Sequence, residues 1–220
     1  MKTDSEIERD VLAELQWAPD IDETNIAVKA VERIVALTGF VHSYPEKHRA
    51  EATAKRVAGV AGVANDIEVR IPARDAIADP DLARDVIVAL QRALPWAWQN
   101  VHPLVHAGRV VLEGSVEWHY QREIADDAVR GVRGVVSMGN SIRIQPQSEP
   151  LQSAEIKKQI EAAFQRHAQI DARQVTVESH GPEVTLRGEV RSWAERDQAE
   201  KTAWSAPGIL HVRNEITVRT

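Results

Sequence analysis

Three segments of the chain carry apolar residues at every fourth position, which is the spacing of one buried helical face. The first apolar triplet starts at Ile7, and equivalent triplets start 75 residues later at Leu82 and a further 74 residues later at Ile156. Acidic residues surround the first triplet, whereas a membrane-surface helix needs flanking cations, so we interpret the stripe as core-facing. The triplets are Ile7, Val11 and Leu15; Leu82, Val86 and Leu90; and Ile156, Ile160 and Phe164.

A residue with capping chemistry stands at the start of each of these helices. Asp4, Asp79 and Ser153 fall in register, and their side chains can accept a hydrogen bond from an N–H of the first helical turn. Pro80 follows Asp79 at the first helical position, where its missing N–H costs nothing. We therefore predict that these three residues are the helix N-caps.

Strand-like alternation follows each first helix. Ile26 and Val28 align with Val175 and Val177, whereas Pro103 takes the second position in the middle copy. Because proline cannot donate to a neighbouring strand, we expect this strand to lie at a sheet edge or to be broken.

A second strand ends in the pattern Leu-x-Gly-x-Val, again at the same offsets. The glycines are Gly39, Gly114 and Gly188. A glycine within a strand marks a bulge or a close backbone approach. We therefore expect each to occupy a position from which a side chain is excluded.

The start of the second helix differs between the repeats. Ser43 with Glu46 and Ser192 with Glu195 have the spacing of capping boxes, whereas the middle repeat has Trp118 in place of the serine. The middle repeat therefore lacks the capping hydroxyl.

Each repeat closes on a glycine-led motif that contains one asparagine. We interpret the asparagine as a turn or strand-entry residue, because its short amide tolerates special backbone angles and bonds to its own backbone. Ligand contact is the alternative. The glycines are Gly59, Gly134 and Gly208, and the asparagines are Asn65, Asn140 and Asn214.

Together these elements predict an α+β fold of three tandem α-β-β-α-β units, each a small three-stranded sheet covered on one face by two helices. The expected boundaries are residues 1–73, 74–147 and 148–220. On these motifs the chain resembles the BON domain family, named from bacterial osmotically induced and nodulation proteins, in three tandem copies. The resemblance implies non-enzymatic binding of phospholipid or association with the cell envelope, and protection under stress.

Composition narrows the chemistry further. The 220 residues include no cysteine, so disulfides and thiolate chemistry are excluded. The net charge is −6, and no segment has the basic surface of a duplex nucleic-acid binder. The acidic N-terminus has no apolar run, so we expect a cytoplasmic protein, or a periplasmic one if an export signal has been removed.

Catalytic and metal-binding patterns are absent from the sequence. No nucleophile elbow, phosphate loop or dinucleotide fingerprint is present. His102 and His106 are four residues apart, but on a strand this places them roughly 13 Å from each other, too far for one metal ion. We therefore expect no enzymatic activity, no cofactor and no metal.

The aromatic residues of the middle repeat are the candidates for an interface or ligand surface. Trp96 aligns with Ile21 and is expected in the core. Trp98 and Trp118 align with polar or small residues in the sister repeats, so we expect them outside the middle repeat's own core, together with Tyr120. Packing between repeats is the alternative interpretation.

Two functions from different classes follow. The first is a peripheral binder of phospholipid or of a membrane surface, as the family resemblance implies. The second is a cytoplasmic scaffold that binds proteins through exposed aromatic residues or a sheet edge.

Overall fold

The computed structural model describes residues 2–146, 153–166 and 174–218. The chain divides into two compact units: residues 1–116 with 121–143 form the first, and residues 117–120 with 144–220 form the second. Every repeat runs helix, strand, strand, helix, strand, which confirms the predicted α+β class and its threefold repetition.

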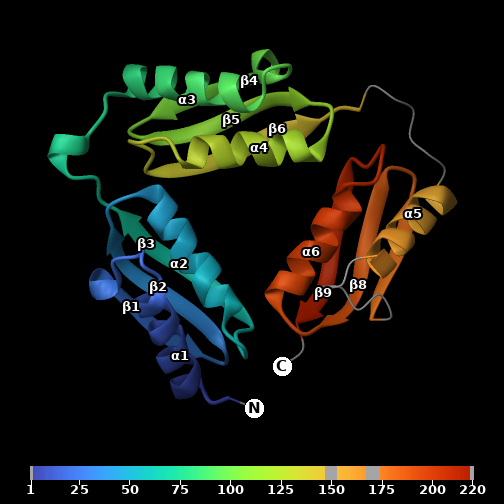
Figure 1. Ribbon diagram of the computed structural model, residues 1–220, viewed down its shortest axis with the longest axis horizontal. Helices are drawn as coiled ribbons and strands as arrows, with labels where there is room; N and C mark the ends of the chain where they lie inside the picture. Colours follow the sequence, from blue (N-terminus) through green and yellow to red (C-terminus); the bar gives the residue numbers. More distant parts are fainter. Residues whose placement is uncertain (1, 147–152, 167–173, 219–220) are drawn as a thin grey trace. The chain divides into compact units, whose positions relative to one another are not determined.

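The helices and strands follow the predicted order in each repeat (Figure 1). The first repeat contains α1 (Asp4–Trp17), β1 (Ile26–Val31), β2 (Ile34–Val41), α2 (Tyr44–Arg56) and β3 (Gly62–Val69). The middle repeat contains α3 (Asp79–Ala93), β4 (Val101–His106), β5 (Arg109–Val116), α4 (His119–Arg130) and β6 (Ser137–Ile144). The third contains α5 (Ser153–Arg166), β7 (Val175–His180), β8 (Glu183–Val190), α6 (Trp193–Trp204) and β9 (His211–Val218).

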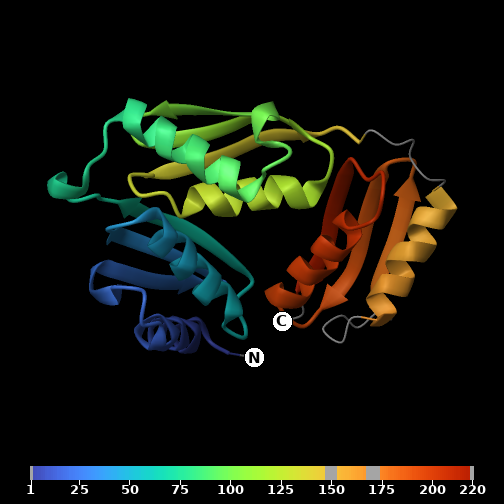
Figure 2. The same cartoon turned by 45° about the horizontal axis from the view of Figure 1, so that its top comes forward.

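The second strand of each repeat is the centre of its sheet. In the first and third repeats it pairs antiparallel with the preceding strand and parallel with the following one, so Leu186 lies between Val177 and Asn214. Both helices of a repeat lie on the same face of its sheet (Figure 2). Pro103 lies in β4, which is an edge strand and is not broken at the proline. Of the two alternatives expected from the sequence, the edge position is therefore the correct one.

One hydrophobic core fills the space between helices and sheet in each repeat. All nine residues of the predicted helical triplets are buried. Ala50, Ala125 and Ala199, at equivalent positions of the second helices, have no exposed surface. Alanine at this position lets the helix approach the sheet closely, which sets the thickness of the two layers.

The strand glycines are required by a close backbone approach. Gly39, Gly114 and Gly188 have φ of +118°, +122° and +139°. A Cβ on Gly188 would lie 1.9 Å from the carbonyl oxygen of Gln174, and the equivalent distance at Gly39 is also 1.9 Å. No side chain fits there, which confirms the prediction.

The predicted N-caps have another role. Thr3, not Asp4, caps α1 and forms a capping box with Glu6. The Asp4 carboxylate instead accepts hydrogen bonds from the backbone N–H groups of Glu32 and Arg33, at 3.0 and 2.9 Å. The prediction was wrong because two free N–H groups in the β1–β2 turn lie within reach of the helix start.

The same correction applies to the other two repeats. Asp79 accepts from the backbone N–H groups of Ala107 and Gly108 between β4 and β5, and these two hydrogen bonds lower the pKa of its carboxyl group. The Ser153 hydroxyl accepts from Gly181 N–H at 2.7 Å. This contact therefore ties the start of the first helix to the strand turn in all three repeats.

The serine caps of the second helices are confirmed. The hydroxyls of Ser43 and Ser192 accept from the backbone N–H groups of Glu46 and Glu195. A capping box would also have the Glu46 carboxylate accept from the backbone N–H of Ser43. Instead, this carboxylate accepts from the backbone N–H groups of His42 and Asp22. Glu46 thereby joins α2 to the loop that precedes β1.

The repeated asparagines lie within the third strands, not at their turns. Asn214 Nδ2 donates to the Arg196 carbonyl oxygen at 3.4 Å and to the Glu200 carboxylate at 2.8 Å, while its Oδ1 accepts from Ile216 N–H. Asn65 and Asn140 make the equivalent three bonds. The asparagine therefore fastens the edge strand to the second helix.

Candidate functional site

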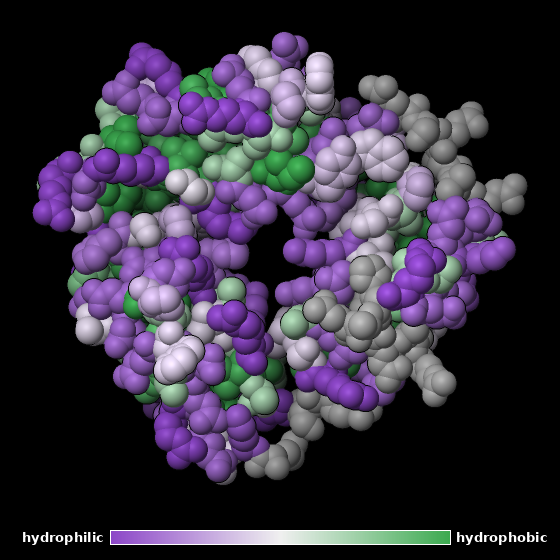
Figure 3. Space-filling model, in the orientation of Figure 1, coloured by the Kyte–Doolittle hydropathy of each residue, from purple (hydrophilic) through white to green (hydrophobic). Residues whose placement is uncertain are grey.

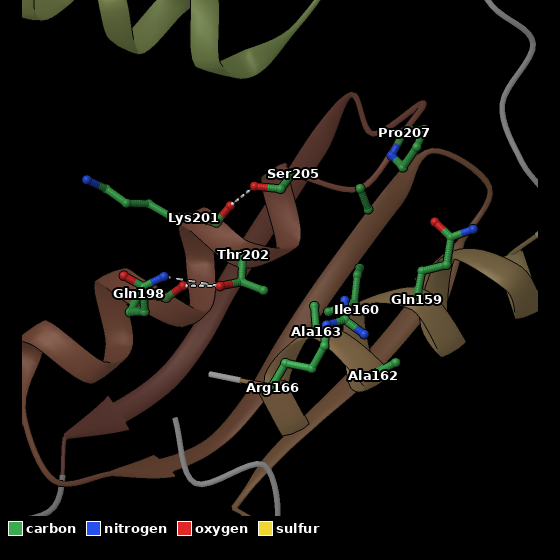
Figure 4. A pocket seen from close by; sticks show the side chains of 11 residues that line it. Gln159, Ile160, Ala162, Ala163, Arg166, Gln198, Lys201, Thr202, Ser205 and Pro207 are labelled. Carbon is green, nitrogen blue, oxygen red and sulfur yellow. Dashed lines mark hydrogen bonds between the residues drawn. The ribbon is translucent and has the colours of Figure 1, made fainter. Parts of the chain in front are cut away.

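A groove separates the two helices of the third repeat (Figure 4). Its volume is about 530 Å³, which is within the range of small-molecule sites. Residues from α5, from α6 and from the turn after α6 line it: Gln159, Ile160, Ala162, Ala163, Arg166, Gln198, Lys201, Thr202, Ser205, Ala206 and Pro207.

The local sequence explains why the helices leave a groove. Alanine at positions 162, 163 and 206 places little side-chain volume between α5 and α6. Thr202 lies at the base, 5% exposed, and its hydroxyl donates to the Gln198 carbonyl oxygen at 2.8 Å. Because the Thr202 hydroxyl makes its hydrogen bond within α6, it does not make the base of the groove polar.

Cationic side chains border this groove. Arg166 comes from the end of α5 and Lys201 from α6, and both are exposed. Figure 4 shows the Arg166 side chain extending from α5 into the groove, whereas the Lys201 side chain extends from α6 away from α5. None of the described lining residues carries a carboxylate. An apolar base with two cations at its border can accept an anionic group attached to an apolar body.

The equivalent groove of the first repeat has a different lining. It is smaller, about 390 Å³, and Trp17 occupies the position of Arg166. Arg49 forms an ion pair with Asp20 at 2.8 Å, and Glu14 lies on the same groove. Its acidic and basic residues balance, so it offers no net charge to an anion.

The same surface of the middle repeat exposes two larger apolar side chains. Val88 and Ile124, which correspond to Ala162 and Gln198 of the third repeat, are 40% and 37% exposed. Figure 3 shows hydrophobic residues reaching the surface over the middle repeat, between largely hydrophilic regions. The three repeats thus share a scaffold and differ in the chemistry between their helices.

The three predicted aromatic residues differ in their burial. Trp98 lies in the 3₁₀ turn before β4 and packs against the middle repeat's own core, so the prediction that it lies outside that core is wrong. Trp118 is half-buried just before α4, and Tyr120 in its first turn is 56% exposed. Trp98 belongs to the first compact unit, whereas Trp118 and Tyr120 belong to the second. Their role as an interface stays a prediction.

The most exposed tryptophans are two others. Trp96, expected in the core, is 96% exposed, and Trp17 is 86% exposed. Leu94 and Ala97 take the buried positions around Trp96. The expectation failed because alignment with Ile21 does not preserve the inward direction across a loop of different conformation.

Two kinds of site are absent from the described part of the chain. No group of three or more histidine, aspartate or glutamate side chains is arranged to hold a metal ion in the residues described. Of the helices that the structure describes, none has both the length and the apolar composition needed to cross a bilayer.

Sequence reasoning missed two sets of residues. The first set is the acidic residues whose carboxylates accept a hydrogen bond from the repeated asparagines: Glu51, Asp126 and Glu200. They recur at the same offsets of 75 and 74, which would have found them in the sequence. Arg166 and Lys201 were missed because the direction of a helical side chain across a groove depends on where the second helix lies.

The family comparison agrees with this threefold architecture. The model of the BON domain matches residues 3–71, 79–146 and 152–220. The chain belongs to the BON domain family. Over 146 residues it is 29% identical to Osmotically-inducible protein Y of Escherichia coli (strain K12), an alignment that covers 64% of this chain and 72% of that protein.

Two solved structures are distantly similar. CdsD, a structural protein of the type III secretion system of Chlamydia trachomatis, has a TM-score of 0.28 and 14% identity over 96% of this chain and 91% of that chain. The periplasmic domain of PrgH has a TM-score of 0.25 and 11% identity, covering 97% and 100%. Both TM-scores are too low to inform the fold or the function of this BON protein.

Proposed function

We propose that this protein is a non-enzymatic, peripheral binder of anionic phospholipid, with the groove of the third repeat as its headgroup site. The observation that carries the proposal is a groove whose described lining has two cations and no carboxylate, in a chain of net charge −6. Membership of the BON family and similarity to an osmotically inducible protein support a role under envelope stress.

The physical case rests on local charge. Arginine and lysine bind phosphate oxygens through charge-assisted hydrogen bonds. Each cation close to an anionic membrane contributes about 1 kcal/mol, and this contribution falls off within a Debye length. The net negative charge of the chain opposes long-range attraction, so binding depends on Arg166 and Lys201 and weakens as salt is added.

Vesicle co-sedimentation tests the proposal. The double variant Arg166→Gln/Lys201→Gln removes two positive charges from the groove, and Lys157→Gln/Lys158→Gln removes two from α5 at positions that do not line it. We expect the groove variant to lose roughly tenfold or more in affinity for phosphatidylglycerol vesicles. Equal losses in both variants, or equal wild-type binding to phosphatidylcholine vesicles, would contradict the groove as the site.

A protein-binding role is the second candidate, and the exposed tryptophans favour it. Trp17 and Trp96 present large rings to solvent, and tryptophan is enriched among the residues that dominate protein interfaces. The double variant Trp17→Ala/Trp96→Ala separates the two functions. Retained vesicle binding with loss of a protein partner supports a scaffold, whereas loss of vesicle binding assigns the tryptophans to the membrane.

A further inference from the structure

A second cavity lies within the first compact unit, where the first repeat leads into the middle one. Its volume is about 600 Å³. The strand β3 is continued by a backbone hydrogen bond from Arg70 N–H to the Val41 carbonyl oxygen, and the chain then turns through the 3₁₀ segment Ala73–Asp75. We call this space the junction cavity.

The walls of the junction cavity are held by contacts on both sides. Tyr44, in the first turn of α2, packs against the core of the middle repeat. Ile77 packs on that same core, and a Cβ on Gly134 would lie 3.2 Å from the Ile77 side chain. The apolar lining comes from both repeats and the connection: Tyr44, Pro45, Ile71, Pro72, Val132 and Val135.

Two arginines converge on one carboxylate in this cavity. Arg74 Nε lies 3.4 Å from Asp75 Oδ2, and an Arg133 Nη donates to Asp75 Oδ1. The arginine side chains are 86% and 68% exposed, and that of Asp75 is 33% exposed. With one acid against two bases, the group carries a net positive charge.

The carboxylate of Asp75 shows which chemical group these two arginines can bind. It is a planar oxyanion held between two guanidinium groups, each of which has five N–H donors. An exposed ion pair of this kind contributes little to stability, so a competing anion can exchange with it at low cost. The apolar wall beside the pair can cover the body of the molecule that carries that anion.

We propose that the junction cavity binds a small organic oxyanion, a phosphate or carboxylate on an aromatic or aliphatic body, which displaces Asp75 from Arg74 and Arg133. The bound molecule touches the end of the first repeat, the connecting segment and the turn before β6 together. It therefore restrains the connection between the first two repeats. This site is separate from the groove of the third repeat and does not depend on it.

The test uses the full chain and three probes. Phenyl phosphate and benzoate combine a ring with a phosphate or a carboxylate, and benzyl alcohol is the neutral control. Amide shifts of Gly131 and Gly134, which line the cavity, are followed by NMR as each probe is added. We expect saturable shifts with the oxyanions and none with the alcohol; the stronger of the two oxyanions identifies the ligand class.

Substitutions then assign the residues. Arg133→Gln and Arg74→Gln should each weaken binding of the oxyanion about tenfold. The control Arg84→Gln removes an exposed, ion-paired arginine on α3. It should change the affinity less than about twofold. Asp75→Asn should strengthen binding, because it removes the internal competitor. The absence of saturable shifts with both oxyanions, an equal loss in Arg84→Gln, or weaker binding by Asp75→Asn would overturn the proposal.

Discussion

The grooves of the first and third repeats lie between equivalent helices, and 149 residues separate Glu14 from Ala163 and likewise Trp17 from Arg166. In the first groove, Arg49 is paired with Asp20. In the third, Gln198 takes the place of Arg49, and no carboxylate is found among the described residues that line the space. One buried residue is common to both grooves, since Thr53 and Thr202 are equivalent and both buried.

This difference shows how a repeated fold separates stability from binding. The residues that hold the layers together recur in every copy, because each repeat must bury its own core. The exposed charged residues at the border of the groove, such as Arg166 and Lys201, lie outside that core, and the first and third repeats carry different residues there. Substitutions in the shared scaffold should therefore change stability most, and substitutions in the groove should change it least.

The largest effect is expected at the strand glycine. In Gly39→Val or Gly188→Val, the new Cβ would meet a backbone carbonyl oxygen at 1.9 Å, and the positive φ is strained for valine. We expect each to destabilise its own repeat by more than about 2 kcal/mol. Thermal unfolding measures this, and an unchanged midpoint would contradict the close approach.

Removal of the strand-to-helix asparagine should have the next largest effect. Asn214→Ala deletes two donated bonds and leaves Ile216 N–H without its side-chain acceptor. We expect the free energy of unfolding to fall by about 1–3 kcal/mol, and to fall similarly in Asn65→Ala. Hydrogen exchange in β9 reports the local effect; protection equal to wild type would show that the asparagine is dispensable.

A pH effect should distinguish the first repeat from the third. Burial, and then the Arg130 guanidinium, lower the pKa of His48 below its usual value of 6.5. The unfolded chain therefore binds a proton at His48 more readily than the folded chain, so stability should fall as pH decreases through about 6.5 and level off below the folded-state pKa. Glu51 and Asp126 partly oppose the shift.

His48→Gln provides the comparison for this prediction. The difference in melting midpoint between wild type and His48→Gln should change between neutral and mildly acidic pH, with wild type losing more on acidification. The third repeat has Asp197 at the equivalent position, so Asp197→Asn should leave the dependence near pH 6.5 intact. Parallel pH curves for wild type and His48→Gln would refute the assignment.

The smallest effect on stability is expected at the ion pair of the first groove. Asp20→Asn breaks an ion pair in which the side chains of Asp20 and Arg49 are 49% and 47% exposed. The free energy of unfolding should therefore change by less than about 0.5 kcal/mol. The variant makes the first groove more like the third by removing a carboxylate beside Arg49. Binding of anionic vesicles should therefore increase; unchanged binding would show that charge in this groove is not what separates the two repeats.

The sequence alone was sufficient for the architecture. The helical triplets, the Leu-x-Gly-x-Val pattern and the glycine-led ending recur at offsets of 75 and 74, and each predicts a local element that the structure contains. Gly188 could be predicted as a site of steric exclusion because glycine weakens a strand and is retained there mainly where the backbone bulges or is closely approached. Helix and strand periodicity follow from the backbone, so they are readable without the fold.

Tertiary structure decided which partners the polar side chains use. Asp4 has good capping chemistry, yet the turn at Glu32 and Arg33, 28 and 29 residues away, competes for its carboxylate. Trp96 aligns with a core residue but points to solvent, because the loop around it has a different path. Arg166 becomes part of a cationic groove only once α6 is packed beside α5, since hydrogen bonds and surface charge depend on distances that sequence spacing does not determine across separate elements.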